Sequence, residues 1–371
     1  MKNKQKKWMV VCFIISILLT GCRFPWKEWT EKKTDIRVYF LDVAQGNSIL
    51  VEDQGEFMLI DGGDRDYSSF VVRYLKNRGV KELKYVVISH YDKDHLNGVV
   101  GVLNTIPCKT VIAPNYATDS KIYKSYRNVM KKKKLEAIYP SAGDTFSIGE
   151  AEFTIVCPKD YHNILENDNS IGLRLVHGKN SFLICGDAGF ASEEEMIQSR
   201  QRLESDVYMA SHHGSRSSSG KEFLAKVNPS YILVSCGVNN EYGHPTKTFM
   251  KRAKETDAEL LRTDLQGTLI ATGNGKEIRW NKEPCNDYRS AEQIENGEHR
   301  KLQEKKKNIR KVSHYVLNTS SHKIHLLTCS SVGAMSEKNK KKVTDSIKNL
   351  KKQGYQICGI CRKEILGETK Q

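Results

Sequence analysis

Two histidines and two aspartates lie within one short segment that follows the apolar run 85–88 and precedes the run 98–103; they are His90, Asp92, Asp94 and His95. The first run predicts a buried strand and the second a helix. The polar segment would then form the turn at the carboxyl end of a strand, where open α/β sheets bind their ligands. Imidazoles and carboxylates that leave such a turn on two sides can hold two divalent cations. The pattern therefore favours a metal site over a solvated polar loop.

Other apolar runs along the chain end in the same kinds of side chain. Asp61 follows the run 57–60, Asp187 follows 181–185, and the pair His212 and His213 follows 206–211. His244 lies in the loop after the run 231–235. Aspartates and histidines repeated at strand ends would bring metal ligands from distant sequence positions to one edge of a sheet.

The order of these motifs resembles a known family. It comprises Asp61-Gly62-Gly63, the His-x-Asp-x-Asp-His segment 90–95, Gly186-Asp187, His212-His213-Gly214-Ser215 and Tyr242-Gly243-His244-Pro245. This set resembles the metallo-β-lactamase fold, in the branch found as the soluble domain of ComEC-type DNA-uptake proteins. Segment 41–48 resembles the opening of that branch, although Ala44 stands where Gly is usual and Asn47 where Asp is usual. The resemblance covers roughly residues 36–280 and implies an αββα sandwich, in which two mixed sheets face each other with helices outside.

The resemblance also implies a ligand set. His90, Asp92 and Asp187 would hold one cation; Asp94, His95, Asp187 and His213 would hold the other, with Asp187 bridging. Asp92 replaces the second histidine of the more usual His-x-His pattern, so both Zn²⁺ and Mn²⁺ fit the donor set.

The remaining polar groups receive supporting roles by the same resemblance. His213 is the expected ligand of the histidine pair, and His212 is expected to contact the substrate or a ligand. Asp61 would orient a ligand histidine, as metal-bound imidazoles require. Asp94 would also orient the attacking hydroxide, and His244 would approach the substrate from the far loop. The alternative for His244 is a loop histidine that is hydrogen-bonded to the backbone.

The start of the chain predicts export. Lys2, Lys4, Lys6 and Lys7 precede the apolar stretch 8–19, which is shorter than the about twenty residues that span a bilayer but suits a signal-peptide core. The sequence Leu19-Thr20-Gly21-Cys22 resembles the bacterial lipoprotein processing signal. We therefore expect residues 1–21 to be a signal peptide and Cys22 to carry a lipid that anchors the protein to the outer face of the cell membrane. An uncleaved anchor is the alternative.

The end of the chain predicts a second metal site. His325 and Cys329, followed by Cys358 and Cys361, have the spacing of zinc ligands. Such a site would hold one structural Zn²⁺ in a small module, residues 312–371, although a disulfide between two of the cysteines is an alternative. The module resembles small zinc modules related to the metal-binding domain of the Ada DNA-repair protein.

The net charge of +15 is concentrated in the last part of the chain, because residues 281–371 contain 20 Lys and Arg against 10 Asp and Glu. Residues 281–311 are charged and poor in apolar side chains, which predicts a linker. Lysines beyond it could bind phosphates, remain solvated, or lie on an anionic membrane.

These features favour a metal-dependent phosphodiesterase or nuclease that acts on DNA or another phosphodiester polymer. One alternative is an esterase acting on a phosphocholine-type wall polymer. The other is a nucleic-acid-binding protein with an inactive metal site.

Overall fold

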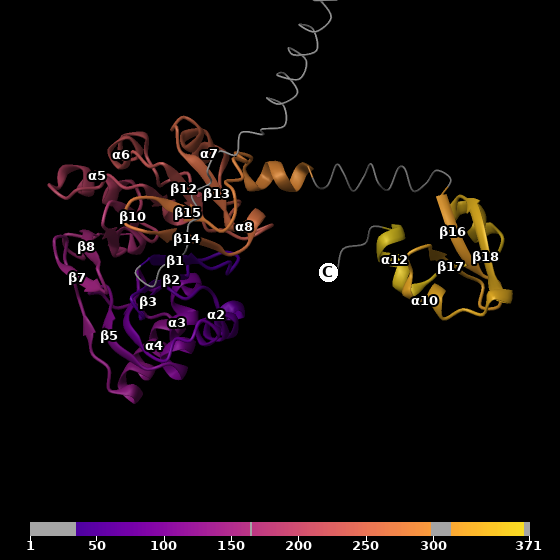
Figure 1. Cartoon of the computed structure of the whole chain (residues 1–371), viewed down its shortest axis with the longest axis horizontal. Helices are drawn as coiled ribbons and strands as arrows, with labels where there is room; N and C mark the ends of the chain where they lie inside the picture. Colours follow the sequence, from indigo (N-terminus) through magenta and orange to yellow (C-terminus); the bar gives the residue numbers. More distant parts are fainter. Residues whose placement is uncertain (1–34, 164, 298–312, 367–371) are drawn as a thin grey trace, which may run out of the picture.

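The computed structural model describes residues 35–163, 165–297 and 313–366 (Figure 1). The expected signal peptide, residues 1–21, and the expected lipidation site Cys22 lie outside the described residues. Within the described ranges, no helix combines the length and apolar character needed to cross a membrane. The larger folded part, residues 35–297, and the smaller one, residues 313–366, are described in turn.

The larger part contains two mixed sheets, and the strands of each are given in their order across the sheet. The first sheet consists of β15 (Ile278–Trp280), β14 (Leu269–Gly273), β1 (Ile36–Phe40), β2 (Ile49–Asp53), β3 (Glu56–Ile60), β4 (Leu83–Val87), β5 (Cys108–Ile112) and β6 (Ala137–Ile138). The second consists of β13 (Glu259–Arg262), β12 (Tyr231–Val234), β11 (Val207–Met209), β10 (Asn180–Ile184), β9 (Gly172–His177), β8 (Ala151–Cys157) and β7 (Thr145–Ile148). Strands β3 to β6 pair in parallel, as do β10 to β13.

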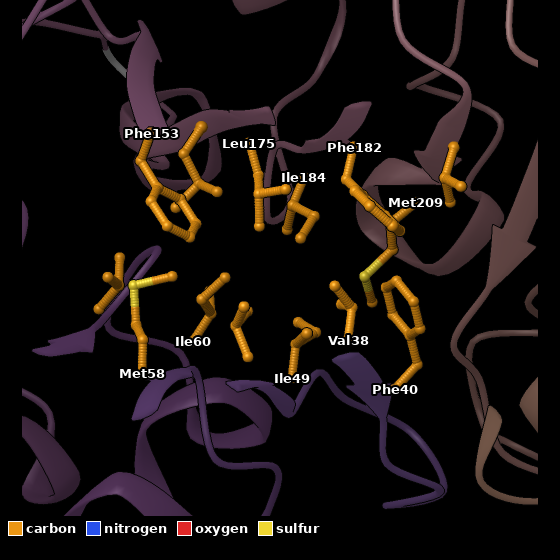
Figure 2. Close-up of a cluster of buried hydrophobic side chains, with 14 of the residues drawn as sticks. Val38, Phe40, Ile49, Met58, Ile60, Phe153, Leu175, Phe182, Ile184 and Met209 are labelled. Atoms are coloured by element: carbon orange, nitrogen blue, oxygen red, sulfur yellow. The ribbon is translucent and has the colours of Figure 1, made fainter. Parts of the chain in front are cut away.

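The two sheets face each other across a buried apolar layer. Side chains from the first sheet such as Val38 and Ile60 meet side chains from the second such as Leu175 and Phe182 (Figure 2). Residues alternate along each strand, so every second side chain enters this layer.

Helices cover the outer face of each sheet. They are α2 (Arg65–Asn77), α3 (Lys93–Thr105) and α4 (Lys121–Lys133) on the first sheet, and α5 (Phe190–Gln198), α6 (Lys221–Val227) and α7 (Lys247–Lys254) on the second. Each helix buries one apolar stripe: Val71 and Leu75 of α2 and Val99 of α3 pack on the first sheet, and Phe223 and Phe249 on the second. The predicted αββα sandwich is confirmed.

Two glycines fix the turn after β3 against the start of α3. A Cβ atom on Gly98 would lie 1.7 Å from the carbonyl oxygen of Gly62, so the two backbones pass closer than any side chain permits. Gly62 N donates to His95 O (2.8 Å) and Gly98 N to Gly63 O (3.0 Å). This contact holds Asp61 beside the helix turn that carries Asp94 and His95.

The predicted linker 281–311 begins too early. Within its described part, Cys285 N donates to Leu260 O (2.9 Å) and Ala291 N to Pro245 O (3.0 Å). The guanidinium of Arg262 donates to Asp287 O (3.0 Å). Residues 281–291 therefore belong to the larger folded part, because the backbone of this polar segment is satisfied by β13 and the loop before α7. Residues 298–311 lie outside the described part of the chain.

The smaller folded part contains a four-stranded sheet and short helices. The strand order is β18 (Lys340–Asp345), β16 (Ser313–Asn318), β17 (Lys323–Leu326) and β19 (Gln356–Ile357), with helices α10 (Ser330–Gly333), α11 (Ile347–Lys352) and α12 (Gly359–Leu366). Its core contains few apolar side chains, including Tyr315, Ile324 and Leu350, together with Cys329, Cys358 and Cys361. A core this small usually requires a metal or another cross-link.

Candidate metal centre

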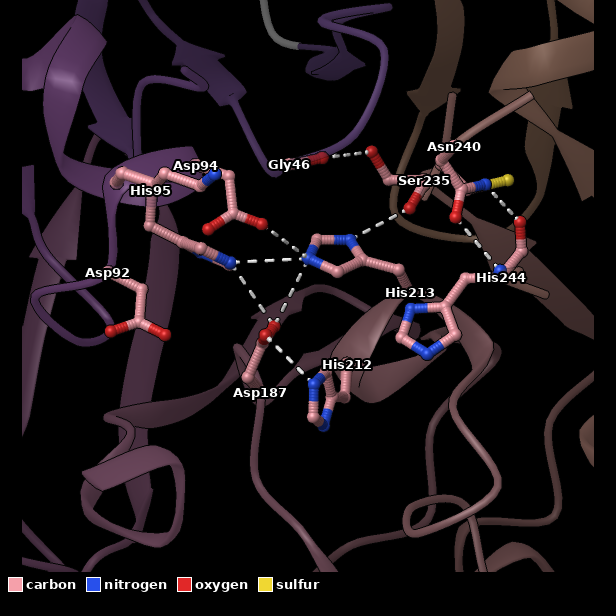
Figure 3. Close-up of polar contacts among 12 residues, drawn as sticks. Gly46, Asp92, Asp94, His95, Asp187, His212, His213, Ser235, Asn240 and His244 are labelled. Carbon is pink, nitrogen blue, oxygen red and sulfur yellow. Dashed lines mark hydrogen bonds and ion pairs between the residues drawn. The ribbon is translucent and has the colours of Figure 1, made fainter. Parts of the chain in front are cut away.

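The strand ends bring two clusters of metal-ligand atoms together between the halves of the sandwich (Figure 3). His90 follows β4, Asp187 follows β10, and His213 follows β11. One cluster contains His90, His95 and Asp187, and the other contains Asp94, His95 and His213. All of these side chains are buried except Asp94, which is partly exposed. The expected edge-of-sheet site therefore exists in the structure.

The spacing of four atoms in this centre fits a tetrahedral cation. His95 Nε2 lies 3.3 Å from His213 Nε2 and 3.2 Å from Asp187 Oδ1. His213 Nε2 lies 3.5 Å from Asp94 Oδ2 and 3.5 Å from Asp187 Oδ1. Ligands about 2.0 Å from a tetrahedral Zn²⁺ would be separated by about 3.3 Å. The observed separations match that edge length.

Unpartnered atoms point to the second position. His90 Nε2 is buried without a hydrogen-bond partner among the described residues, as is Asp187 Oδ1 of the first position. His90 Nε2 lies 3.9 Å from Asp187 Oδ2, whereas His213 lies near the other oxygen, Oδ1. Buried polar atoms of this kind are costly unless they bind something. Asp187 thus has one carboxylate oxygen toward each cluster, which is the geometry of a bridging ligand.

Neighbouring groups hold the histidine rings in ligand-ready orientations. Asp61 Oδ2 accepts from His95 Nδ1 (2.8 Å), and the carbonyl oxygen of Ser235 accepts from His213 Nδ1 (2.9 Å). A proton fixed on Nδ1 leaves the Nε2 lone pair free for a cation. Asp61 occupies the orienting position expected of it.

The electrostatics keep the carboxylates ionised. Burial alone would raise the pKa of Asp187, but the imidazoles of His213 and His95 lower it well below its usual range. Burial also opposes ionisation of Asp94, and its contact with His213 lowers the pKa of this carboxyl below the usual range. Both aspartates are therefore anionic at neutral pH, as ligands of a divalent cation must be.

The histidine pair owes its geometry to a strained turn. His212 and His213 adopt left-handed backbone angles, with φ of 52° and 55°, and Gly214 follows with φ of 78°. Each non-glycine residue in this region costs roughly 1–2 kcal/mol. The turn buries the His213 ring among the ligands and leaves His212 partly exposed, with its Nε2 3.7 Å from Asp187 Oδ2.

Asp92, His212 and His244 lie outside both clusters. Asp92 Oδ2 is 3.7 Å from His90 Nε2, and its side chain is 46% exposed. The His244 ring stacks at 6.4 Å from that of His213 and lies 5.5 Å from that of His212, so it borders the centre without joining it. Burial and the two neighbouring histidines lower the pKa of His244 to about 4. Its ring is neutral at pH 7.

Two residues of the centre were missed by the sequence analysis. Ser89 N and Oγ donate to the two oxygens of Asp61 (2.8 and 2.7 Å), and its Oγ also lies 3.0 Å from His90 Nδ1. The carbonyl oxygen of Ser235 accepts a hydrogen bond from His213 Nδ1. Ser89 could have been identified from its position directly before the His-Asp segment. The role of Ser235 could not, because any residue type has a backbone carbonyl.

The smaller folded part contains the second predicted site. His325, Cys329, Cys358 and Cys361 are buried, and their ligand atoms all lie within 4.8 Å of one another. His325 Nδ1 is 3.5 Å from Cys329 Sγ. A nitrogen and a sulfur that both bind a tetrahedral Zn²⁺ are also separated by about 3.5 Å. All three cysteines are free thiols, so the alternative of a disulfide is not realised. The cluster suits one structural zinc with four protein ligands.

Comparison with known proteins identifies the family. Residues 41–238, more than half of the chain, match the family described as the Metallo-beta-lactamase superfamily. The chain belongs to this superfamily. This result agrees with the two sheets and the His/Asp centre described above, and with the resemblance that the order of the motifs predicted.

Two bacterial proteins are similar to the chain in sequence. The chain is 31% identical over 281 residues to the Competence protein ComA of Neisseria gonorrhoeae, covering 72% of this chain and 38% of that protein. It is 26% identical over 254 residues to the ComE operon protein 3 of Bacillus subtilis, covering 62% of this chain and 32% of that protein. This metallo-β-lactamase chain therefore spans about a third of the length of these relatives.

Among solved structures, the metallo-beta-lactamase fold protein YhfI from Bacillus subtilis is similar with a TM-score of 0.45 and 12% identity, covering 64% of this chain and all of that one (100%).

Proposed function

We propose that this protein is an exported, membrane-anchored phosphodiesterase that hydrolyses DNA with two divalent cations. The observation that carries the proposal is the position of Asp187. One of its carboxylate oxygens lies near the buried imidazoles of His95 and His213, and the other lies near that of His90. A carboxylate in that position can join two cations into one reactive centre. Pairs of cations a few Å apart are typical of enzymes that cleave phosphate esters.

The residues that would hold the cations follow from the clusters. Asp94, His95, His213 and Asp187 would hold one, and His90 and Asp187, with Asp92 at its exposed edge, would hold the other. Both Zn²⁺ and Mn²⁺ suit imidazole and carboxylate ligands. When bound, such a pair supplies a nucleophile at neutral pH and stabilises negative charge on a phosphoryl oxygen.

Three side chains act on the substrate and the water in this proposal. Asp94 is anionic and partly exposed, so it would accept a hydrogen bond from the attacking water and orient it. His212 is partly exposed beside Asp187 and can donate a hydrogen bond to a phosphoryl oxygen. His244 is neutral at pH 7. It would therefore donate a hydrogen bond to the substrate as a neutral imidazole and would not act as a cationic acid.

DNA is the proposed substrate for two reasons. The chain resembles ComEC-type DNA-uptake proteins in its motifs and is similar to a competence protein, and the part of the chain after residue 281 is strongly basic. We further propose that a lipid on Cys22 holds the protein at the outer face of the cell membrane, and that the smaller folded part, with zinc bound by His325 and three cysteines, contributes lysines to DNA binding.

The proposal is tested by incubating purified residues 23–371 with labelled single- and double-stranded DNA in Mn²⁺ or Zn²⁺. We expect hydrolysis by the wild type and none by Asp187→Ala. 4-Nitrophenylphosphocholine provides the comparison substrate. Hydrolysis of this ester, with DNA and bis(4-nitrophenyl) phosphate left intact, would contradict the proposal and favour the wall-polymer esterase.

A further inference from the structure

The exposed face of helix α4 is the most basic surface element of the larger folded part. Residues 36–280 contain 31 Lys and Arg and 31 Asp and Glu, so this part is neutral overall. The segment 121–134 contains no acidic residue and carries seven exposed basic side chains, which are Lys121, Lys124, Arg127, Lys131, Lys132, Lys133 and Lys134. Positive charge is therefore concentrated on one helix of an otherwise balanced domain.

Four of these side chains form a stripe along the helix. Lys121, Lys124, Arg127 and Lys131 are spaced by three, three and four residues, which places them on one side of an α-helix. The opposite side of α4 packs on the core through Tyr126, Val129 and Met130. We call these four residues the α4 stripe.

The stripe lacks the acidic partners that a purely solvated helix face usually has. Among the described residues, only Lys124 lies near a carboxylate, that of the fully exposed Asp119 at 3.8 Å. Elsewhere in the same domain, surface lysines pair closely, as Lys221 does with Glu255 and Lys84 with Glu56. The α4 stripe thus leaves its charge available to an anionic partner.

Helix α4 begins next to the metal centre and runs away from it. Tyr91 directly follows the ligand residue His90, and its N–H donates to the Tyr116 hydroxyl (3.2 Å) in the loop before α4. The ring of Tyr123, in the first turn of α4, lies 4.7 Å from the Tyr91 ring. At the other end, Lys133 Nζ donates to Asn104 O near the end of α3 (2.9 Å). Helix α4 therefore lies beside α3 and runs from the segment after His90 toward the end of α3 (Figure 1).

We propose that the α4 stripe binds the phosphate backbone of a DNA strand whose scissile bond lies at the metal centre. This proposal rests on the proposed function and extends it, because it assigns the path of the strand away from the reaction site. A helix of this length spans about 20 Å. A DNA strand lying along a helix of that length would present several phosphates to the α4 stripe. Binding should therefore strengthen with strand length until the strand spans the stripe.

Salt dependence is the direct signature of such contacts. Each phosphate neutralised by a lysine or arginine releases counterions and adds about 0.7 to the slope of log affinity against log salt for single strands. Loss of four contacts would flatten the slope by roughly 3. Extrapolated from 1 M to 0.1 M salt, this slope difference corresponds to a fall in affinity of about 10²- to 10³-fold.

The experiment uses the full chain from residue 23 in the Asp187→Ala background, so that binding is measured without hydrolysis. Fluorescence anisotropy with 4- and 24-nucleotide single strands compares the α4 variant with a matched control. In the α4 variant, Lys121, Lys124, Arg127 and Lys131 are changed to Gln. In the control, four exposed lysines on other elements, Lys179, Lys226, Lys254 and Lys276, are changed to Gln. Surface changes of this kind leave stability nearly unaltered.

The parent protein should bind the 24-mer more tightly than the 4-mer, and the α4 variant should lose most of this difference. Its slope of log affinity against log salt should be flatter by the amount given above. The control should behave as the parent. A variant that combines Lys121→Arg, Lys124→Arg and Lys131→Arg should keep the steep slope. Equal slopes for the α4 variant and the control would overturn the proposal. Because hydrolysis is not measured, this result is independent of whether the protein proves to be a phosphodiesterase.

Discussion

Replacement of Asp61 by Asn tests whether the groups behind the histidines control metal binding. Asp61 is 1% exposed, and one of its oxygens accepts from both His95 Nδ1 (2.8 Å) and Ser89 Oγ (2.7 Å). Its other oxygen accepts from Ser89 N (2.8 Å). An amide can keep the bond to Ser89 N, but its NH₂ group would then face the proton on His95 Nδ1. To avoid two opposed donors, His95 must move this proton to Nε2, the atom that the cation needs.

The expected loss follows from this tautomer change. Groups that orient a metal-bound histidine are worth 10- to 100-fold in metal affinity, which corresponds to about 1.4–2.8 kcal/mol. We expect the upper end of this range, because His95 is fully buried (0% exposed) and water cannot replace the lost acceptor. High metal concentrations should restore hydrolysis, since the ligands themselves remain.

The assay is competition for Zn²⁺ or Mn²⁺ between the protein and a chromophoric chelator, combined with hydrolysis measured against metal concentration. Asp64→Asn is the matched control, because Asp64 is a nearby aspartate whose carboxylate caps α2 and accepts from Asn97 (2.7 Å) outside the metal centre. An Asp61→Asn protein with the metal affinity of the control would refute the tautomer argument.

The other predictions concern distant parts of the chain. Cys358→Ser should remove one tightly bound zinc and make residues 313–366 sensitive to protease, because a structural zinc supplies much of the folding energy of a small domain; unchanged zinc content would contradict this. Burial raises the pKa of Glu193 to about 7, so the folded protein holds this proton more tightly than the unfolded chain does. The stabilisation is complete below about pH 4.5 and is lost as pH rises through 7, by roughly 3 kcal/mol; Glu193→Gln should flatten the urea-midpoint profile over this window, and an identical profile would count against it. Cys22→Ser should block lipid attachment, which unchanged detergent partitioning and precursor mass would disprove.

The sequence specified the elements of the centre well because its signals are local. The apolar runs before His90, Asp187 and His213 predicted strands at the right places, and the short polar segments after them predicted ligands at strand ends. These signals depend only on neighbouring residues, and the αββα architecture followed from the order of the motifs.

Features that depend on contacts between distant segments were beyond the sequence. The hydrogen bond from His213 to the carbonyl oxygen of Ser235 requires that β11 and β12 lie side by side. The satisfied backbone of residues 281–291 depends on the exposed edge of β13, so composition alone predicted a linker there. The exposure of Asp92 likewise reflects how the turn after β4 packs, which residue types in that turn do not determine.

Metal content of the purified protein tests the central claim, a two-cation centre bridged by Asp187, most directly. Elemental analysis of residues 23–371 should find about three metals per chain, two in the hydrolase centre and one zinc in the smaller part. Asp187→Ala should retain about one, because loss of the bridge weakens both positions of the centre while the His/Cys site is untouched. About three metals in both proteins, or about one in the wild type, would contradict the account.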